Sequence, residues 1–252
     1  GCRIAVLAPD WTRPLLDRMP EVEKGLSLEL GHGDLGLGNR RALGKSLRGE
    51  QFTRAIILPN SFKSALIPFH AGIVNRVAWR GEWRNILLSD CRRLDKNAYP
   101  LMVQRFAALA FPASDHPPAA IPEPKLHTDR VSVEKALRSF DLDGKNRILA
   151  ICPGAEFGEA KQWPAAHFAT ACSKKIDEGW KVWIFGSKKD TEVAEEVIRL
   201  LSPEHRLSCV SLTGMTSLAQ AIDLLSVADA VISNDSGLMH IAAALDKPVV
   251  AL

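Results

Sequence analysis

Residues 233–240 have the residue types expected of an anion-binding site. They read Ser-Asn-Asp-Ser-Gly-Leu-Met-His and pass directly from an apolar run into a helical pattern. Small residues at Ser236 and Gly237 let backbone amides approach a ligand, and the free N–H groups and dipole of the new helix favour a phosphate. Asp235 suits sugar hydroxyls or a helix cap, and His240 can donate to a phosphate oxygen. The alternative is an Asn/Asp/Ser helix cap followed by a core histidine.

Residues 152–164 form a second candidate loop between a strand pattern and a helix pattern. Glycines at 154 and 158 permit a tight loop, and Lys161 brings a cation beside the same crevice. A fixed ammonium there would stabilise the charge that develops on a departing nucleoside diphosphate. The loop contains no Gly-Lys-Ser/Thr and lacks the dinucleotide fingerprint, which disfavours both common phosphate loops. A solvent-facing lysine is the alternative.

Two weaker segments, residues 186–190 and 212–218, follow other strand patterns. Asp190 suits ribose hydroxyls, and the apolar side chains of Met215 and Leu218 could sandwich a flat nucleobase. Acidic helix starts and Thr or Ser caps are routine, so both segments are also explained as ordinary helix starts.

The first half of the chain is basic. Residues 1–125 hold 18 Lys and Arg against 12 Asp and Glu, whereas residues 126–252 hold 14 against 17. Asn60, Ser61 and Lys63 join a strand pattern to a helix start, and Arg80 lies in a cluster of five arginines, so phosphorylated or carboxylated acceptor groups could bind here. The alternative is a solvated basic face. Nucleic acid is not expected as a partner, because the interleaved tryptophans form no recognised binding module.

Alternating strand and helix patterns predict the parallel sheets that would bring these segments together. Strands are expected at 3–8, 54–59, 85–89, 147–152, 181–185, 207–212, 230–233 and 248–252, and helices at 40–48, 61–71, 100–110, 165–178, 191–201, 217–227 and 237–245. A doubly wound sheet binds ligands beyond the carboxyl ends of its strands. Repeated prolines at 111–124 predict a linker, which gives two domains, 1–124 and 125–252.

The composition is that of an ordinary globular protein, with 46% apolar and 24% charged residues among 252. We find neither an apolar run of membrane-spanning length nor a signal-peptide pattern, so the sequence predicts a cytoplasmic protein. The five cysteines are scattered and odd in number, which favours reduced core residues over metal ligands or disulfides. The chain starts without Met and ends on an apolar run, as expected of a fragment.

Five motifs in this sequence, taken in order, resemble those of the ADP-heptose transferases of glycosyltransferase family 9, in particular the heptosyltransferase II group. They are Asn60-Ser-Phe-Lys-Ser-Ala, Trp79-Arg-Gly-Glu, Cys152-Pro-Gly-Ala-Glu-Phe-Gly, Lys161-Gln-Trp-Pro and Asn234-Asp-Ser-Gly-Leu-Met-His. The resemblance implies an α/β fold of the GT-B type, with two Rossmann-like domains. It also implies inverting transfer of heptose from ADP-heptose to the first heptose of the lipopolysaccharide inner core, with no metal and no cofactor.

The resemblance further implies roles for individual residues. Lys161 is expected to support the leaving diphosphate, Asp190 to bind the ribose, and Thr216 with Leu218 to bind the adenine. The donor is expected to contact Gly154, Ala155, Glu156, Phe157, Lys161, Asp190, Thr216, Leu218, Asn234, Asp235, Ser236, Gly237 and His240. The acceptor, a Kdo-lipid A bearing one heptose, is expected at Asn60, Ser61, Lys63 and Arg80. Because this acceptor is membrane-anchored, the enzyme is expected to be cytoplasmic and peripheral at the inner membrane.

The sequence departs from the family pattern at both ends. Members begin with a strand and loop whose Gly-Asp pair supplies the general base, and they continue past the final apolar run with a Gly/Ser-rich loop and helices. No residue here matches those parts, so the first strand of the N-terminal domain and the C-terminal helices are expected to be missing. A catalytically inactive sugar-nucleotide-binding fragment is therefore the alternative function. A sugar-nucleotide epimerase is a weaker one, since no convergent pair of carboxylates supports it.

Overall fold

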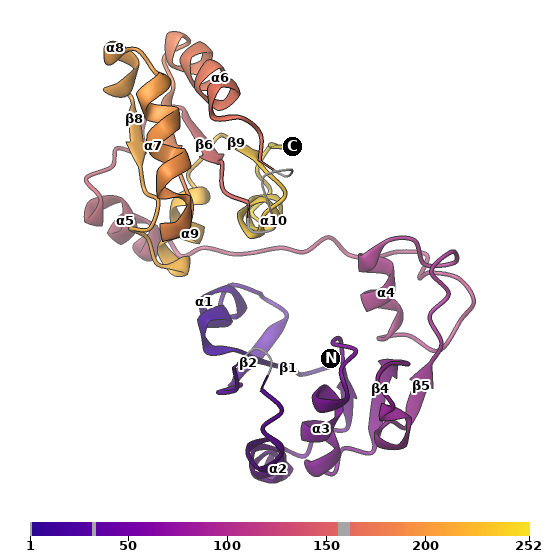
Figure 1. Ribbon diagram of the computed structural model, residues 1–252. Coiled ribbons are helices and arrows are strands. Elements are labelled where there is room, and N and C mark those ends of the chain that lie inside the picture. The colour runs from indigo at the N-terminus through magenta and orange to yellow at the C-terminus, as the bar shows by residue number, and fades with distance from the viewer. Residues whose placement is uncertain (1, 32–33, 156–161) are drawn as a thin grey trace. The chain divides into compact units, whose positions relative to one another are not determined.

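The computed structural model describes residues 2–31, 34–155 and 162–252 (Figure 1). The chain divides into two compact units, one of Gly1–Leu28 with Glu123–Leu252 and the other of Glu29–Pro122. The expected boundary at 124 lies close to the observed change at 122. The first 28 residues, however, group with the C-terminal unit, because Leu15 and Met19 pack against its core.

The larger unit is built on a five-stranded parallel sheet in the order β10-β9-β6-β7-β8. Its strands are β6 (Ile148–Cys152), β7 (Lys181–Ile184), β8 (Cys209–Ser211), β9 (Ala230–Ser233) and β10 (Val249–Ala251). The central strand β6 is buried at all five positions, as its unbroken apolar sequence predicts for a strand covered on both faces. The predicted α/β class with parallel sheets is confirmed.

Two apolar clusters cover the opposite faces of this sheet. Alternate residues of β6 enter different clusters, with Ile148 and Ala150 in one and Leu149 and Ile151 in the other. The first cluster includes side chains of α5 (Arg130–Ser139), α9 (Leu218–Leu225) and α10 (Gly237–Ala244), and the second includes side chains of α6 (Ala165–Asp177) and α7 (Thr191–Leu200). A short helix, α8 (Pro203–Arg206), precedes β8. The doubly wound arrangement places each strand-to-helix loop at the carboxyl end of its strand.

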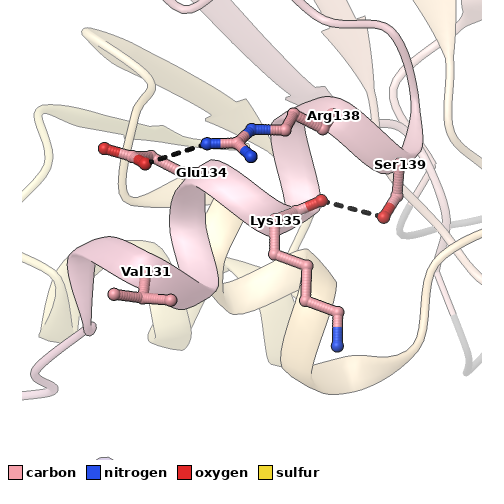
Figure 2. Close-up of a pocket in the computed structure, with 5 residues that line it drawn as sticks. All are labelled: Val131, Glu134, Lys135, Arg138 and Ser139. Atoms are coloured by element: carbon pink, nitrogen blue, oxygen red, sulfur yellow. Dashed lines mark hydrogen bonds and ion pairs between the residues drawn. The ribbon is translucent and has the colours of Figure 1, made fainter.

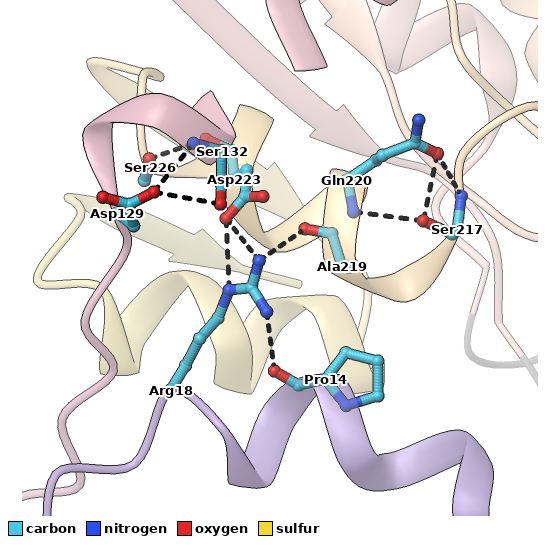
Figure 3. Close-up of polar contacts among 9 residues, drawn as sticks. All are labelled: Pro14, Arg18, Asp129, Ser132, Ser217, Ala219, Gln220, Asp223 and Ser226. Carbon is cyan, nitrogen blue, oxygen red and sulfur yellow. Dashed lines mark hydrogen bonds and ion pairs between the residues drawn. The ribbon is translucent and has the colours of Figure 1, made fainter. Parts of the chain in front are cut away.

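The first 28 residues form a small βαβ element. Strand β1 (Ile4–Ala8) pairs in parallel with β2 (Val22–Ser27), and between them lie the 3-10 turn η1 (Asp10–Thr12) and α1 (Arg13–Leu16). Helix α1 contacts α9. Just after α1, Arg18 donates hydrogen bonds to Asp223 and to the carbonyl oxygen of Ala219 (Figure 3).

The smaller unit has a three-stranded parallel sheet, β3-β4-β5. Its elements are α2 (Leu37–Ser46), η2 (Leu47–Glu50), β3 (Arg54–Ile56), η3 (Phe62–Ala65), α3 (Leu66–His70), β4 (Asn75–Trp79), η4 (Arg84–Leu87), β5 (Asp90–Arg92) and α4 (Met102–Ala108). The strand predicted at 85–89 is wrong. A 3-10 turn occupies 84–87 because positive φ angles at Glu82 (31°) and Trp83 (52°) turn the chain sharply after β4. The next strand then begins at Asp90.

Within the described residues, no helix combines the length and the apolar character needed to cross a bilayer.

Candidate functional site

The polar loops selected from the sequence meet at one edge of the five-stranded sheet. Because β9, β6, β7 and β8 are parallel neighbours, the segments that follow them start on the same side. These segments carry Asp235, Gly154, Asp190 and Thr216. The structure thus brings together predicted donor residues that lie more than 80 positions apart.

Asn234 holds the loop after β6 in place. Its side chain is fully buried, its Nδ2 donates to the carbonyl oxygen of Pro153 at 2.7 Å, and its Oδ1 accepts from the N–H of Trp163 at 3.1 Å. One amide therefore ties both ends of this loop to β9. In the structure Asn234 supports the loop after β6, and its predicted contact with the donor stays a prediction. The predicted residues Glu156, Phe157 and Lys161 lie outside the described residues.

The start of α10 presents backbone amides without a side-chain cap from its N-cap residue. Ser236 has an extended conformation (φ −143°, ψ 167°) and makes no capping hydrogen bond, and its Oγ lies 3.2 Å from Oγ of Ser233. A Cβ added at Gly237 would meet no atom within 4 Å. Asp235 and His240 are exposed beside this helix end. The side chain of Ser236 therefore does not cap the first amides of α10, and amides at a helix start are groups that favour an anion.

Gly154 and Asp190 bring the loops after β6 and β7 into close contact. A Cβ at Gly154 would lie 2.3 Å from the carboxylate carbon of Asp190, so only glycine fits this position as the structure stands. The carboxylate is fixed by Ser187, whose backbone N–H and Oγ both donate to Oδ2, at 2.7 and 2.8 Å. Asp190 thus stands at the sheet edge in one defined orientation.

The segment after β8 offers apolar and polar groups side by side. Ser217 caps α9 by accepting from the N–H of Gln220, whose Oε1 accepts in return from the N–H of Ser217 at 2.9 Å. Leu218 is half-buried against the core, and Met215 is 63% exposed. Of the two apolar side chains considered for a nucleobase, Met215 is the accessible one, and Leu218 partly supports the fold.

The five cysteines differ in exposure: Cys152 and Cys172 are buried, Cys209 is partly buried, and Cys2 and Cys91 are exposed. Burial raises the pKa of Cys152 and of Cys172 to about 12, so both thiols stay protonated and are unsuited to nucleophilic chemistry. Cys2 and Cys91 are exposed, which corrects the expectation that all five lie in the core. Among the described residues, no group of His, Cys, Asp or Glu could hold a metal ion.

In the smaller unit, the predicted acceptor residues lie at the end of β3 around a buried arginine. Arg84 is fully buried and donates to Oδ1 of Asn60 at 3.2 Å, to Oγ of Ser64 at 2.8 Å and to the carbonyl oxygen of Trp79 at 2.7 Å. Burial lowers the pKa of this guanidinium. Arg84 belongs to the cluster of five arginines that the sequence predicts could hold acceptor groups, but in the structure it is an internal support of the loop at residues 60–64.

The Trp79-Arg-Gly-Glu motif also contacts the loop that follows β3. A Cβ at Gly81 would lie 2.4 Å from the carbonyl oxygen of Asn60, and Oε2 of Glu82 accepts from the N–H of Phe62 at 2.7 Å. Arg80 itself is exposed, and Nζ of Lys63 donates to the carbonyl oxygen of Asp34 at 3.2 Å. No feature of the sequence alone distinguishes the buried arginines of the cluster, Arg84 and Arg92, from the exposed ones.

A hollow of about 460 Å³ lies elsewhere, along α5 (Figure 2). It is lined by Val131, Glu134, Lys135, Arg138 and Ser139. Arg138 pairs with Glu134 at 3.2 Å, and Oγ of Ser139 donates to the carbonyl oxygen of Lys135. Because all its lining comes from one exposed helix surface and none from the strand ends, this hollow is not part of the candidate site.

Comparison with known proteins supports the resemblance to glycosyltransferase family 9 that the sequence motifs indicated. Residues 40–252 match the sequence model of glycosyltransferase family 9 (heptosyltransferase). Lipopolysaccharide heptosyltransferase 2 of Escherichia coli is 48% identical over 99% of this chain and 73% of its own length. Lipooligosaccharide heptosyltransferase 2 of Haemophilus influenzae is 49% identical over 100% of this chain and 74% of its own length.

Solved structures of similar proteins have the same fold as this chain. The structure of E. coli ADP-heptose LPS heptosyltransferase II superposes with a TM-score of 0.89 at 45% identity, covering 99% of this chain and 75% of that one. A family 9 glycosyl transferase of Veillonella parvula, at 16% identity, shares the fold with a TM-score of 0.79 and 99% and 72% coverage. The predicted GT-B fold class is confirmed. The family model matches residues 40–252, and two heptosyltransferase 2 relatives are 48% and 49% identical to this chain. The chain therefore belongs to glycosyltransferase family 9, the heptosyltransferases.

Proposed function

We propose that this protein transfers heptose from ADP-heptose to the first heptose of the lipopolysaccharide inner core, with inversion at the anomeric carbon. The proposal is supported by relatives that carry the name lipopolysaccharide heptosyltransferase 2 at 48% identity. The observation that carries it is the start of α10, where the N-cap residue Ser236 makes no capping hydrogen bond, on the same sheet edge as the Gly154–Asp190 contact. This edge offers an anion site beside a fixed carboxylate.

The strand-end loops suit the parts of an ADP-sugar. In this proposal the amides of Ser236 and Gly237, with His240, bind the diphosphate. Asp190 binds the ribose hydroxyls, and Asp235 binds the heptose. Thr216, Leu218 and the exposed Met215 face the adenine. A heptosyltransferase of E. coli has been solved with ADP-2-deoxy-2-fluoro heptose, and this chain shares its fold with a TM-score of 0.69.

The transfer itself needs charge stabilisation on the leaving group. The acceptor hydroxyl oxygen attacks the anomeric carbon from the face opposite ADP, the bond from that carbon to the phosphate oxygen breaks, and ADP departs with the electron pair. The hydroxyl proton goes to a base, a role that the sequence assigns to no residue of this chain. Lys161 and the α10 amides then balance the charge that develops on ADP. The proposal includes no metal and no cofactor.

The acceptor in this proposal is a Kdo-lipid A bearing one heptose, an anionic lipid held at the inner membrane. Asn60, Ser61, Lys63 and Arg80 would bind its polar groups, since they lie on or beside the loop that Arg84 supports. The protein would then act at the cytoplasmic face as a peripheral enzyme.

Calorimetric titration with ADP-heptose tests the donor site, with UDP-glucose as the control nucleotide sugar. We expect ADP-heptose to bind, and Asp235→Ala to weaken binding of ADP-heptose more than that of ADP. Mass spectrometry of a heptosylated acceptor tests transfer. Absence of ADP-heptose binding would contradict the proposed function. Binding without transfer would instead identify a sugar-nucleotide-binding protein.

A further inference from the structure

The turn η4 projects two large apolar side chains into solvent. Trp83 is 94% exposed and Ile86 is 82% exposed. Trp83 immediately precedes the 3-10 turn and Ile86 lies within it, so two strongly exposed apolar side chains stand three positions apart at one turn of the chain. We call Trp83 and Ile86 the apolar tip. Single exposed apolar residues are ordinary, but an adjacent tryptophan and isoleucine exposed to this degree indicate a surface that meets a partner.

The apolar tip is held rigidly from below. Arg84 and Leu87, the first and last residues of the turn, are 0% and 6% exposed. Arg84 is anchored by its hydrogen bonds to Asn60 and Trp79, and Leu87 packs in the unit's apolar core. The backbone also adopts φ of 52° at Trp83, a conformation that bulky residues rarely take. The exposure of the tip is therefore built into the fold.

The unit that carries the apolar tip has an excess of positive charge. Residues 29–122 hold thirteen Lys and Arg against seven Asp and Glu. Arg92 is paired with Asp90 and Arg84 is buried, whereas Arg80, Arg93 and Lys96 are exposed in the same stretch of chain. An exposed tryptophan and an exposed aliphatic side chain, in a stretch of chain that also exposes cations, match the chemistry of an anionic lipid surface, where indoles lie at the headgroup level and cations meet phosphates.

We infer that the apolar tip inserts into the interface of an anionic lipid bilayer, with Arg93 and Lys96 pairing with lipid phosphates. Arg84 connects the tip directly to Asn60 and Ser64, so insertion would place the loop at residues 60–64 against the membrane surface. This part of the inference rests on the proposed function, in which that loop binds a membrane-anchored acceptor. The contact is a two-part signal, apolar insertion plus charge, as reversible peripheral binding requires.

Sedimentation with vesicles tests the inference. We compare vesicles of phosphatidylglycerol and phosphatidylethanolamine with vesicles of phosphatidylcholine alone. The unmodified protein should bind the anionic vesicles more tightly, and Trp83→Ser with Ile86→Ser should weaken that binding by about tenfold or more. The matched control is Val131→Ser with Leu207→Ser, whose side chains are 72% and 85% exposed in the larger unit. This control should leave vesicle binding unchanged.

A charge variant measures how much the cations contribute to membrane binding. A soluble acceptor tests the proposed function independently of membrane binding. Arg93→Gln with Lys96→Gln should weaken binding to anionic vesicles by roughly twentyfold and leave the weak binding to phosphatidylcholine unchanged. Transfer to a deacylated, water-soluble acceptor should be the same for the Trp83/Ile86 variant and the unmodified protein. If neither the unmodified protein nor the Trp83/Ile86 variant transfers heptose to this acceptor while vesicle binding changes as expected, the proposed function is wrong. The inference that the apolar tip binds a membrane would then still be supported.

Two results would contradict the inference that the apolar tip binds a membrane. One is equal vesicle binding by the unmodified protein and the Trp83/Ile86 variant. The other is loss of a dimer on size-exclusion chromatography when the apolar tip is replaced, because the tip would then be a contact between protein chains. Thermal melts of each variant establish that the substitutions, all at exposed positions, leave the fold intact.

Discussion

The guanidinium of Arg18 lies 2.6 Å from the carboxylate of Asp223 (Figure 3). Both side chains are largely buried, with exposed fractions of 14% and 5%. Arg18 also donates to the carbonyl oxygens of Pro14 and Ala219, so its charge is well compensated. The pair joins the first βαβ element to α9, the helix that begins next to the predicted adenine-binding residues.

Removing one partner of this pair should destabilise the protein. Arg18→Met leaves the Asp223 carboxylate buried without its cation, which we expect to cost about 3 kcal/mol in the free energy of unfolding. Adding Asp223→Leu should recover most of the loss, because an apolar pair needs no compensation. Urea unfolding measures both. The control is Arg130→Met, which removes an exposed pair with Glu134 and should cost under about 0.5 kcal/mol. Equal effects at the two sites would contradict the prediction.

The contact between Gly154 and Asp190 predicts a specific loss of donor binding. In Gly154→Ala the new methyl group must displace the Asp190 carboxylate, which then loses its two hydrogen bonds from Ser187. We expect the Kd for ADP to rise by roughly tenfold, about 1.4 kcal/mol, with little change in melting temperature. Calorimetry measures the Kd. Gly38→Ala, where a Cβ meets nothing within 4 Å, should bind ADP normally. Unchanged affinity in Gly154→Ala would remove Asp190 from the donor site.

Arg84 gives a prediction for the acceptor side. Lysine has no planar fork, so Arg84→Lys cannot satisfy Asn60, Ser64 and Trp79 together. We expect the KM for the acceptor to rise about tenfold or more, while the Kd for ADP stays the same because the residues proposed to bind the nucleotide belong to the other unit. Arg41→Lys, at an exposed position of α2, is the control. A variant that loses ADP affinity to the same extent would show a general folding defect instead.

Much of the fold was predictable because the second half uses short apolar strands with polar loops at their ends. Residues 148–152 and 230–233 need no long-range information to be recognised as buried strands. The contact between Arg18 and Asp223 was not predictable, since it joins residues 205 positions apart and neither position differs in type from an ordinary surface charge. The strand expected at 85–89 failed for a local reason. Its apolar residues belong to a 3-10 turn that exposes Ile86 and buries Leu87.

Site roles were harder to predict than site location. The sequence predicted that Asn234 contacts the donor, whereas in the structure its buried amide binds the backbone of Pro153 and Trp163. Arg80 and Arg84 are four positions apart and identical in type, yet one is exposed and the other is fully buried. Burial depends on packing between β4 and the loop after β3, which no local pattern encodes.

The buried thiols predict how stability depends on pH. An unfolded cysteine ionises near pH 9, whereas burial raises the pKa of Cys152 and Cys172 to about 12 in the folded protein. Above pH 9 the unfolded chain loses these protons and the folded chain keeps them, so the unfolded state gains stability. The free energy of unfolding should therefore fall between about pH 9 and pH 12, by about 1.4 kcal/mol per pH unit for each thiol.

Urea unfolding of Cys172→Ala measures this contribution. Its stability at pH 8 should be lower than that of the unmodified protein, because the substitution leaves a small cavity in the core. From pH 9 upward, however, its stability should fall less steeply, by about 1.4 kcal/mol per pH unit. Cys91→Ala, at an exposed position, should follow the unmodified protein at every pH. Parallel pH profiles for the two variants would show that the Cys172 thiol does not keep its proton in the folded state.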